Sequence, residues 1–177
     1  MNAGALAGAP EALLERAVRL TLEWASGPTA GDAGAPDAPD AAPGPPDAAP
    51  GVQDAAPGPP GVGRAAEISL TLLGDEEIAA LNRQYLGREG STDVLAFSLG
   101  EPDAPLGDVY VGFEQAGRQA VEHRVPLDEE LARLAIHGTL HVLGHDHPDG
   151  PDRVDSPMFR LQERLLGELL GRPGTGR

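Results

Sequence analysis

The sequence predicts a single α+β domain built from helices and short strands. Three short stretches are rich in β-forming residues, and the first of them alternates polar and apolar side chains, which is typical of a half-buried strand. Several longer stretches repeat apolar residues at helical spacing. The order is one helix, a low-complexity segment, a mixture of strands and helices, and a helical end, which favours an α+β layer structure. With 177 residues, the chain is long enough for one hydrophobic core.

The first expected helix covers residues 10–25. Pro10 suits a first helical turn, where its missing N–H costs nothing, and an apolar face follows at helical spacing through Leu14, Val18 and Trp24. The first expected strand covers residues 67–72, where polar and apolar residues alternate.

The middle of the chain alternates between helices and strands. A helix after Gly74 has Ile78, Leu81 and Tyr85 on one face and ends at Gly87. Residues 92–98 and 107–112 are short strands, the loop between them contains two prolines, and residues 113–123 form a helix that ends at a lone histidine, His123. The last helix begins at Ser156-Pro157, a capping hydroxyl followed by proline.

Residues 27–63 differ from the rest of the chain in composition. They consist largely of Pro, Ala, Gly and Asp, and a seven-residue near-repeat begins each time with Asp-Ala-Ala-Pro-Gly. Such a segment buries too little to offset its ordering entropy, so we expect a disordered, inserted tether, with a partner-binding segment as the alternative. The predicted division is therefore an N-terminal helix of the domain, the insert, a folded body and a disordered tail (residues 1–26, 27–63, 64–171 and 172–177).

Charge and composition limit the possible functions. The formal net charge of −15 makes general binding of nucleic acid unfavourable, although residues 27–63 account for five of the acidic groups. Six arginines could offset this charge if they gathered beside the site described next (Arg83, Arg88, Arg118, Arg133, Arg160 and Arg164). The chain has no cysteine, and neither a signal peptide nor a membrane-spanning stretch is expected.

Three histidines near the C-terminus have the spacing of a metal site. On a helix that opens near residues 126–127, His137 and His141 lie four residues apart and therefore on one face. Gly144 permits the positive φ that ends a helix, so the chain can turn and bring His147 back as a third ligand. Three imidazoles favour zinc first, with nickel, copper or iron possible, and they leave a fourth position open, as in a catalytic site.

The residue after the first histidine excludes one class of enzyme. The spacing of the three histidines is also that of metzincin proteases, in which a glutamate directly after the first histidine acts as the base. This chain has Gly138 there, and glycine performs no acid–base chemistry. Peptide hydrolysis by that route is therefore not expected.

The same segment, His137 to His147, resembles the signature of the YbeY family of bacterial endoribonucleases. Residues 81–85, followed by residues 91–97, are similar to a second block of that family, and residues 106–109 are similar to a third. The three blocks occur in the family's order and cover nearly all of the expected folded body.

This resemblance implies a zinc-dependent endoribonuclease, with one ion, that cuts single-stranded RNA. It further implies action in 16S rRNA 3′-end maturation, ribosome assembly and quality control, a cytoplasmic location, contact with the ribosome or its small subunit, and a mixed sheet of about four strands. The alternative is a metal-binding ribosome assembly factor that cuts nothing. The attacking group could be metal-activated water or the 2′-hydroxyl of the RNA, and both stay open.

The chain departs from the family pattern near Tyr85. Many members have an arginine directly after this tyrosine, whereas this chain has Leu86, so Arg88 is the weak candidate for a catalytic arginine. The family usually begins with a strand before its first helix, and the first nine residues here are not strand-like. Beside the third ligand, Asp146 either orients an imidazole or caps the turn, and His145 is expected to face solvent.

Overall fold

The computed structural model describes residues 9–26, 66–101, 104–148 and 150–172, and the predictions for residues 27–63 and for residues after 172 lie outside this part. Five helices occur in it: α1 (Ala9–Ser26), α2 (Asp75–Leu86), α3 (Phe113–His123), α4 (Leu127–Val142) and α5 (Pro157–Leu169). Three strands complete the domain: β1 (Glu67–Leu73), β2 (Val94–Ser98) and β3 (Leu106–Gly112). The α+β prediction is therefore confirmed.

The strands form one mixed sheet in the order β1-β3-β2. The central strand β3 pairs in parallel with β1 and antiparallel with β2. The sheet has three strands among the described residues, not about four. The fourth strand would precede the first helix, but α1 already begins at Ala9, and the residues before it lie outside the described part.

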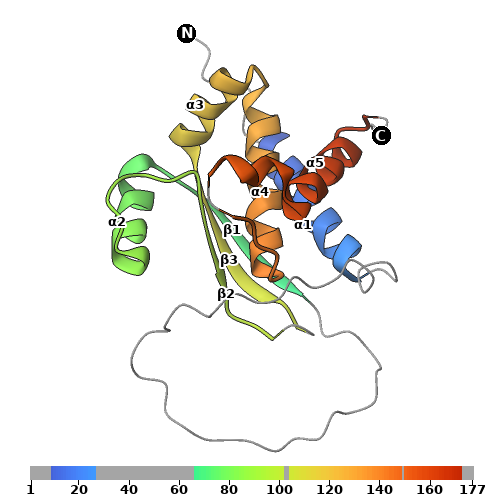
Figure 1. The fold of residues 1–177 in the computed structure, drawn as a ribbon, viewed down its shortest axis with the longest axis horizontal. Coiled ribbons are helices and arrows are strands. Elements are labelled where there is room, and N and C mark those ends of the chain that lie inside the picture. Colours follow the sequence, from blue (N-terminus) through green and yellow to red (C-terminus); the bar gives the residue numbers. More distant parts are fainter. Residues whose placement is uncertain (1–8, 27–65, 102–103, 149, 173–177) are drawn as a thin grey trace, which may run out of the picture.

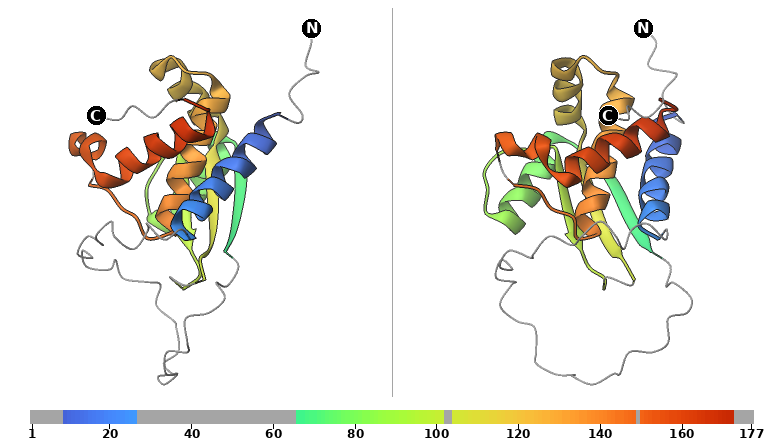
Figure 2. Two further views of the ribbon diagram at one scale, coloured as in Figure 1. Left: turned by 90° about the vertical axis from the view of Figure 1, so that its right-hand side faces the viewer. Right: turned by 45° about the vertical axis from the view of Figure 1, so that its right-hand side comes forward.

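Helix α4 lies between the sheet and a second layer of helices (Figure 1). One side of α4 contacts β2 and β3, and other sides contact α1, α3 and α5. In Figure 1, α2 lies on the opposite side of the strands from α1 and α5, and both views of Figure 2 show α5 crossing α4. Among the described residues, no helix combines the length and the apolar character that crossing a membrane requires.

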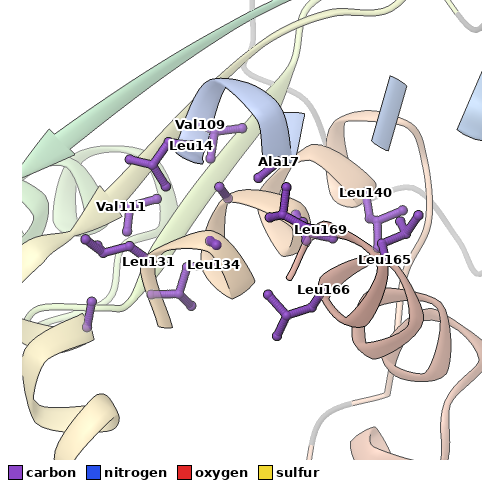
Figure 3. Packing of buried hydrophobic residues seen from close by; sticks show 14 of the residues in the cluster. Leu14, Ala17, Val109, Val111, Leu131, Leu134, Leu140, Leu165, Leu166 and Leu169 are labelled. Carbon is purple, nitrogen blue, oxygen red and sulfur yellow. The ribbon is translucent and has the colours of Figure 1, made fainter. Parts of the chain in front are cut away.

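The core is centred on α4 because this helix is enclosed on most of its surface. Its Leu131, Ile136 and Leu140 are at most 1% exposed and belong to one buried cluster with Val109 and Val111 of β3. In Figure 3, Leu131 lies near Val111, and Leu140 lies near Leu165 of α5. Leucines of α1 and α5 complete this cluster (Leu14, Leu165, Leu166 and Leu169). Burial on this scale, about 1.5–3 kcal/mol for each large apolar side chain, fixes the position and rotation of α4.

Candidate metal centre

The C-terminal half of α4 supplies the first two histidines. His137 is 4% exposed, and the His141 side chain is 28% exposed, so both rings lie at the edge of the core. Their Nε2 atoms are 3.1 Å apart, as the four-residue spacing predicted. The C-terminal half of α4 therefore holds both rings on one side of the helix.

A tight turn after α4 supplies the third histidine. Gly144 has φ +84°, in the left-handed region that favours glycine, and its N–H donates to the carbonyl of His141 over 3.0 Å. The turn places Nε2 of His147 3.4 Å from Nε2 of His137. One ligand atom from each of the three histidines lies within 4.8 Å of the other two. The structure therefore brings together the three rings that the sequence singled out.

Hydrogen bonds on the far side of two rings set which nitrogen carries the proton. His137 Nδ1 lies 2.7 Å from Gln162 Oε1, and the amide of Gln162 is oriented by its donation to Glu163 over 3.0 Å. His147 Nδ1 lies 3.1 Å from the carbonyl oxygen of Pro148. Both partners only accept, so both Nδ1 atoms donate, and each Nε2 presents a lone pair to the common point.

Burial keeps the His137 and His141 imidazoles in the form that binds metal. Burial, together with the charge that His141 would carry, lowers the pKa of His137 to about 4, against the opposing hydrogen bond to Gln162. Burial also lowers the pKa of His141, followed by the charge of His147. Neutral imidazole is the metal ligand, so the donor set fits one soft or borderline ion such as Zn²⁺.

The residues between Gly144 and His147 have structural roles. Asp146 accepts from the backbone N–H of His147 over 2.8 Å, whereas its carboxylate is 3.9 Å from His141 Nδ1, too far for a hydrogen bond. Asp146 therefore caps the turn. The expectation that His145 faces solvent is wrong: its ring is partly buried, with its centroid 5.5 Å from that of Trp24 on α1, because the turn folds back against that helix.

The weak catalytic candidate Arg88 does not line the cavity beside His137, and a different arginine does. Arg88 is exposed in the segment after α2, outside the cavity that contains His137. Instead, Nη2 of Arg153 lies 3.5 Å from Nε2 of His137. Arg153 lies in a 3₁₀ helix, Pro151–Asp155, between α4 and α5. Neither Arg153 nor Gln162 has a sequence spacing that points to the histidines, and this explains why sequence reasoning missed them.

A cavity of about 230 Å³ opens beside His137. Its wall includes Asp93, Glu130, Arg133, Arg153 and Gln162. A larger hollow of about 780 Å³ lies elsewhere, between α1 and β1, and contains none of the three histidines.

The six arginines do not form a basic strip around the histidines. Arg83 pairs with Glu89, Arg118 pairs with Asp75, and Arg133 pairs with several glutamates. The guanidinium of Arg164 lies 5.9 Å from the centre of the Trp24 ring. His123 ends α3, as predicted, contacts Glu130 at 3.2 Å and lines the same cavity as His137.

Comparison with known proteins gives one consistent family. A family model described as endoribonuclease YbeY matches residues 52–170. A relative from Pelotomaculum thermopropionicum with that name is 43% identical over 117 residues, covering 62% of this chain and 76% of the relative. A relative of the same name from Moorella thermoacetica is 44% identical over 118 residues, covering 60% and 74%.

One solved structure, of a protein from Thermotoga maritima, is 33% identical to this chain and covers 60% of it and 70% of its own length. Its TM-score of 0.46 is too low to add an argument about the fold.

Proposed function

The chain belongs to the endoribonuclease YbeY family, and we propose that it is a metal-dependent endoribonuclease that cuts single-stranded RNA. One observation carries the proposal: Nε2 atoms of His137, His141 and His147 converge on a common point. Three protein ligands are typical of catalytic zinc, which keeps one position for substrate or water. We propose one Zn²⁺ ion, held by these three side chains.

The proposed mechanism assigns each nearby side chain a separate task. Gln162 holds His137 in the tautomer that offers Nε2, and Asp146 holds the turn that carries His147. When bound, the ion supplies a Lewis acid, which either lowers the pKa of water towards about 7 or polarises a phosphoryl oxygen. Both water and the 2′-hydroxyl of the RNA remain candidate nucleophiles.

The proposed biological role follows from the family. We propose action in 16S rRNA 3′-end maturation, ribosome assembly and quality control, in the cytoplasm and in contact with the small subunit. The proposed domain division is the one expected from the sequence, with residues 64–171 as the hydrolase body, joined to helix α1 by an inserted tether.

A second candidate is a metal-binding assembly factor without nuclease activity. Two observations favour it: Leu86 follows Tyr85 where many family members have arginine, and only Arg133 of the six arginines considered above lines the cavity beside His137. Under this alternative the protein binds metal and sediments with ribosomal subunits, but it does not cut RNA in any metal state.

The deciding experiment measures the metal content of the purified protein together with cleavage of a single-stranded RNA. We expect about one zinc per chain, cleavage that stops with a chelator and cleavage that returns with zinc. His141→Ala should lose both metal and cleavage, whereas the control His145→Ala should keep both, because its ring packs on Trp24. Full, metal-independent cleavage by His141→Ala would reject the mechanism.

A further inference from the structure

Two arginines line the cavity beside His137, and one of them is neutralised inside the protein. Arg133 donates to Glu130 and to Glu163, the latter over 2.9 Å, and lies 3.6 Å from Glu129. Its side chain is only 17% exposed. Because these carboxylates already use its charge and its N–H groups, Arg133 has little to offer a ligand.

Arg153 is the opposite case. Its guanidinium is partly exposed and lies 3.5 Å from His137 Nε2, the atom with a free lone pair. Among the described residues, no carboxylate lies within 4.0 Å of this guanidinium, although Asp152 and Asp155 are its neighbours in the chain. Most of its five N–H donors are therefore available to an anion.

The position of the Arg153 guanidinium indicates which kind of anion it binds. A metal held by three histidine Nε2 atoms would lie about 2 Å from each of them, so a guanidinium at the same nitrogen would face a second cation. Two cations at this range repel each other unless an anion lies between them. A phosphodiester meets the need of both, because the planar fork of arginine can donate to one non-bridging oxygen and an adjacent ester oxygen while the other non-bridging oxygen faces the ion.

The wall beside Arg153 suits a nucleotide better than a bare phosphate ion. Val154, the next residue, is 55% exposed and lines the same cavity, together with Phe159. An apolar surface next to the guanidinium can contact the sugar or base attached to the phosphate.

We propose that Arg153 is the phosphate-binding residue of the site and that it holds the scissile phosphodiester of RNA against the three histidines. This rests on the proposed function for the identity of the ligand. Its guanidinium donates to one non-bridging oxygen in the bound state, and this bond strengthens as negative charge builds up on that oxygen during cleavage.

The first test measures binding without chemistry. A single-stranded RNA oligonucleotide is titrated in the presence of a chelator, at several salt concentrations, with fluorescence anisotropy as the readout. Arg153→Ala should bind about tenfold more weakly, and its plot of log K against log salt should be shallower by about 0.7, the loss of one phosphate contact. Arg153→Lys keeps the charge and should keep the slope.

The control is Arg160→Ala, because Arg160 is exposed on α5 and does not line the cavity. It removes the same charge and should keep the wild-type slope. If Arg153→Ala does not fold, as judged by circular dichroism, Arg153→Gln replaces it, with the same expected loss of slope.

The second test separates this residue's role from that of the metal. With zinc bound, Arg153→Ala should lower kcat on the order of 10²–10³-fold at unchanged zinc affinity, and Arg153→Lys should still lower kcat because it lacks the planar fork. Cleavage and a salt slope equal to wild type in Arg153→Ala would overturn the proposal while leaving the nuclease function standing, as would a loss of zinc affinity. The wild-type protein could also fail to cut RNA while its salt slope still depends on Arg153. That result would support the phosphate site and reject the nuclease function.

Discussion

At the scale of single residues, the two nitrogens of His137 have different partners and therefore different tasks. Nδ1 donates to Gln162 over 2.7 Å, and Nε2 lies next to the Nε2 atoms of the other two histidines. Gln162 is 2% exposed, so this hydrogen bond is shielded from bulk solvent. The hydrogen bond fixes both the tautomer and the rotation of the ring before any metal arrives.

Replacing Gln162 by leucine tests this coupling. The variant removes the acceptor and leaves the Nδ1–H group of His137 buried without a partner, which costs about 1–3 kcal/mol of stability. The ring is then free to rotate or to adopt the other tautomer, so zinc affinity should fall about 10–100-fold. Competition with a chromophoric chelator measures the affinity, and urea unfolding measures the stability.

The control is Gln84→Leu, an exposed glutamine on α2. It should leave zinc affinity unchanged. Wild-type affinity in Gln162→Leu would mean that the helix alone orients His137.

The histidines could be predicted from the sequence and their partners could not. His137 and His141 share a helix face, and Gly144 signals the turn, so local geometry alone places all three rings. Gln162 is 25 residues from His137 and Arg153 is 16 residues away, so their contacts depend on how the segment after α4 returns. His145 was misjudged for the same reason, because its neighbour Trp24 is on α1.

At the scale of elements, α4 can approach the sheet closely because it has a glycine at the contact. Gly138 faces β2 and β3: a Cβ at this residue would lie 2.5 Å from Cγ1 of Val109 and 3.1 Å from Cγ2 of Val94. In the sequence, Gly138 indicated only that the catalytic glutamate of a metzincin protease is missing. The structure adds a physical reason, since a side chain here would point into the sheet and away from the three rings.

Gly138→Ala should therefore destabilise the protein although alanine favours helix. The methyl group forces α4 away from β3, at a cost of about 1–3 kcal/mol, typical of overpacking. Gly167→Ala on α5 is the matched control, because nothing lies within 4 Å of its added Cβ. The control should gain up to about 1 kcal/mol from helix propensity. Urea unfolding of both variants gives the comparison, and equal stability of the two would refute the close-packing account.

The location of each helix and strand could be predicted because its periodicity is local. The total number of strands in the sheet, and the way they pair, could not. The stretches 67–72, 92–98 and 107–112 all became strands, with β1 one residue longer and β3 beginning one residue earlier. The expectation of about four strands came from the family, not from a fourth alternating stretch in this chain. Likewise, nothing in the alternation of β1 shows that it pairs in parallel with β3 rather than with its neighbour in sequence, β2.

At the scale of the whole molecule, the acidic excess is not balanced at the site. The net charge is −15, and internal ion pairs occupy several arginines, including Arg133 and Arg172, both of which contact Glu129. RNA approaching the histidines is therefore attracted by few cations, and long-range steering contributes little to its binding. Specific contacts, or a partner that delivers the RNA, must therefore supply the affinity for RNA. The assembly-factor alternative is consistent with such a partner.

Protonation of His137 affects both the stability of the fold and the binding of metal. Its pKa is lowered from 6.5 to about 4 in the folded protein, mainly by burial. The unfolded chain therefore accepts a proton at higher pH than the folded protein does. The stability associated with this residue is fully present above about 6.5 and is lost as the pH falls through about 4.

Metal-free protein should show this loss in urea unfolding. Between about pH 7.5 and pH 5, the shift at His137 should remove about 2 kcal/mol of stability, at about 1.4 kcal/mol for each pH unit below the unfolded pKa. The glutamine of His137→Gln cannot titrate. The stability of this variant should therefore fall by about 2 kcal/mol less than that of wild type over the same pH interval. Carboxylates titrate in both proteins and cancel in the comparison. Zinc should raise the stability of wild type at the higher pH by RT ln(1 + [Zn]/Kd), and should lose this effect as protons compete for the ligands. Parallel pH profiles for wild type and His137→Gln without metal would show that the buried ring is not the residue that links folding to pH.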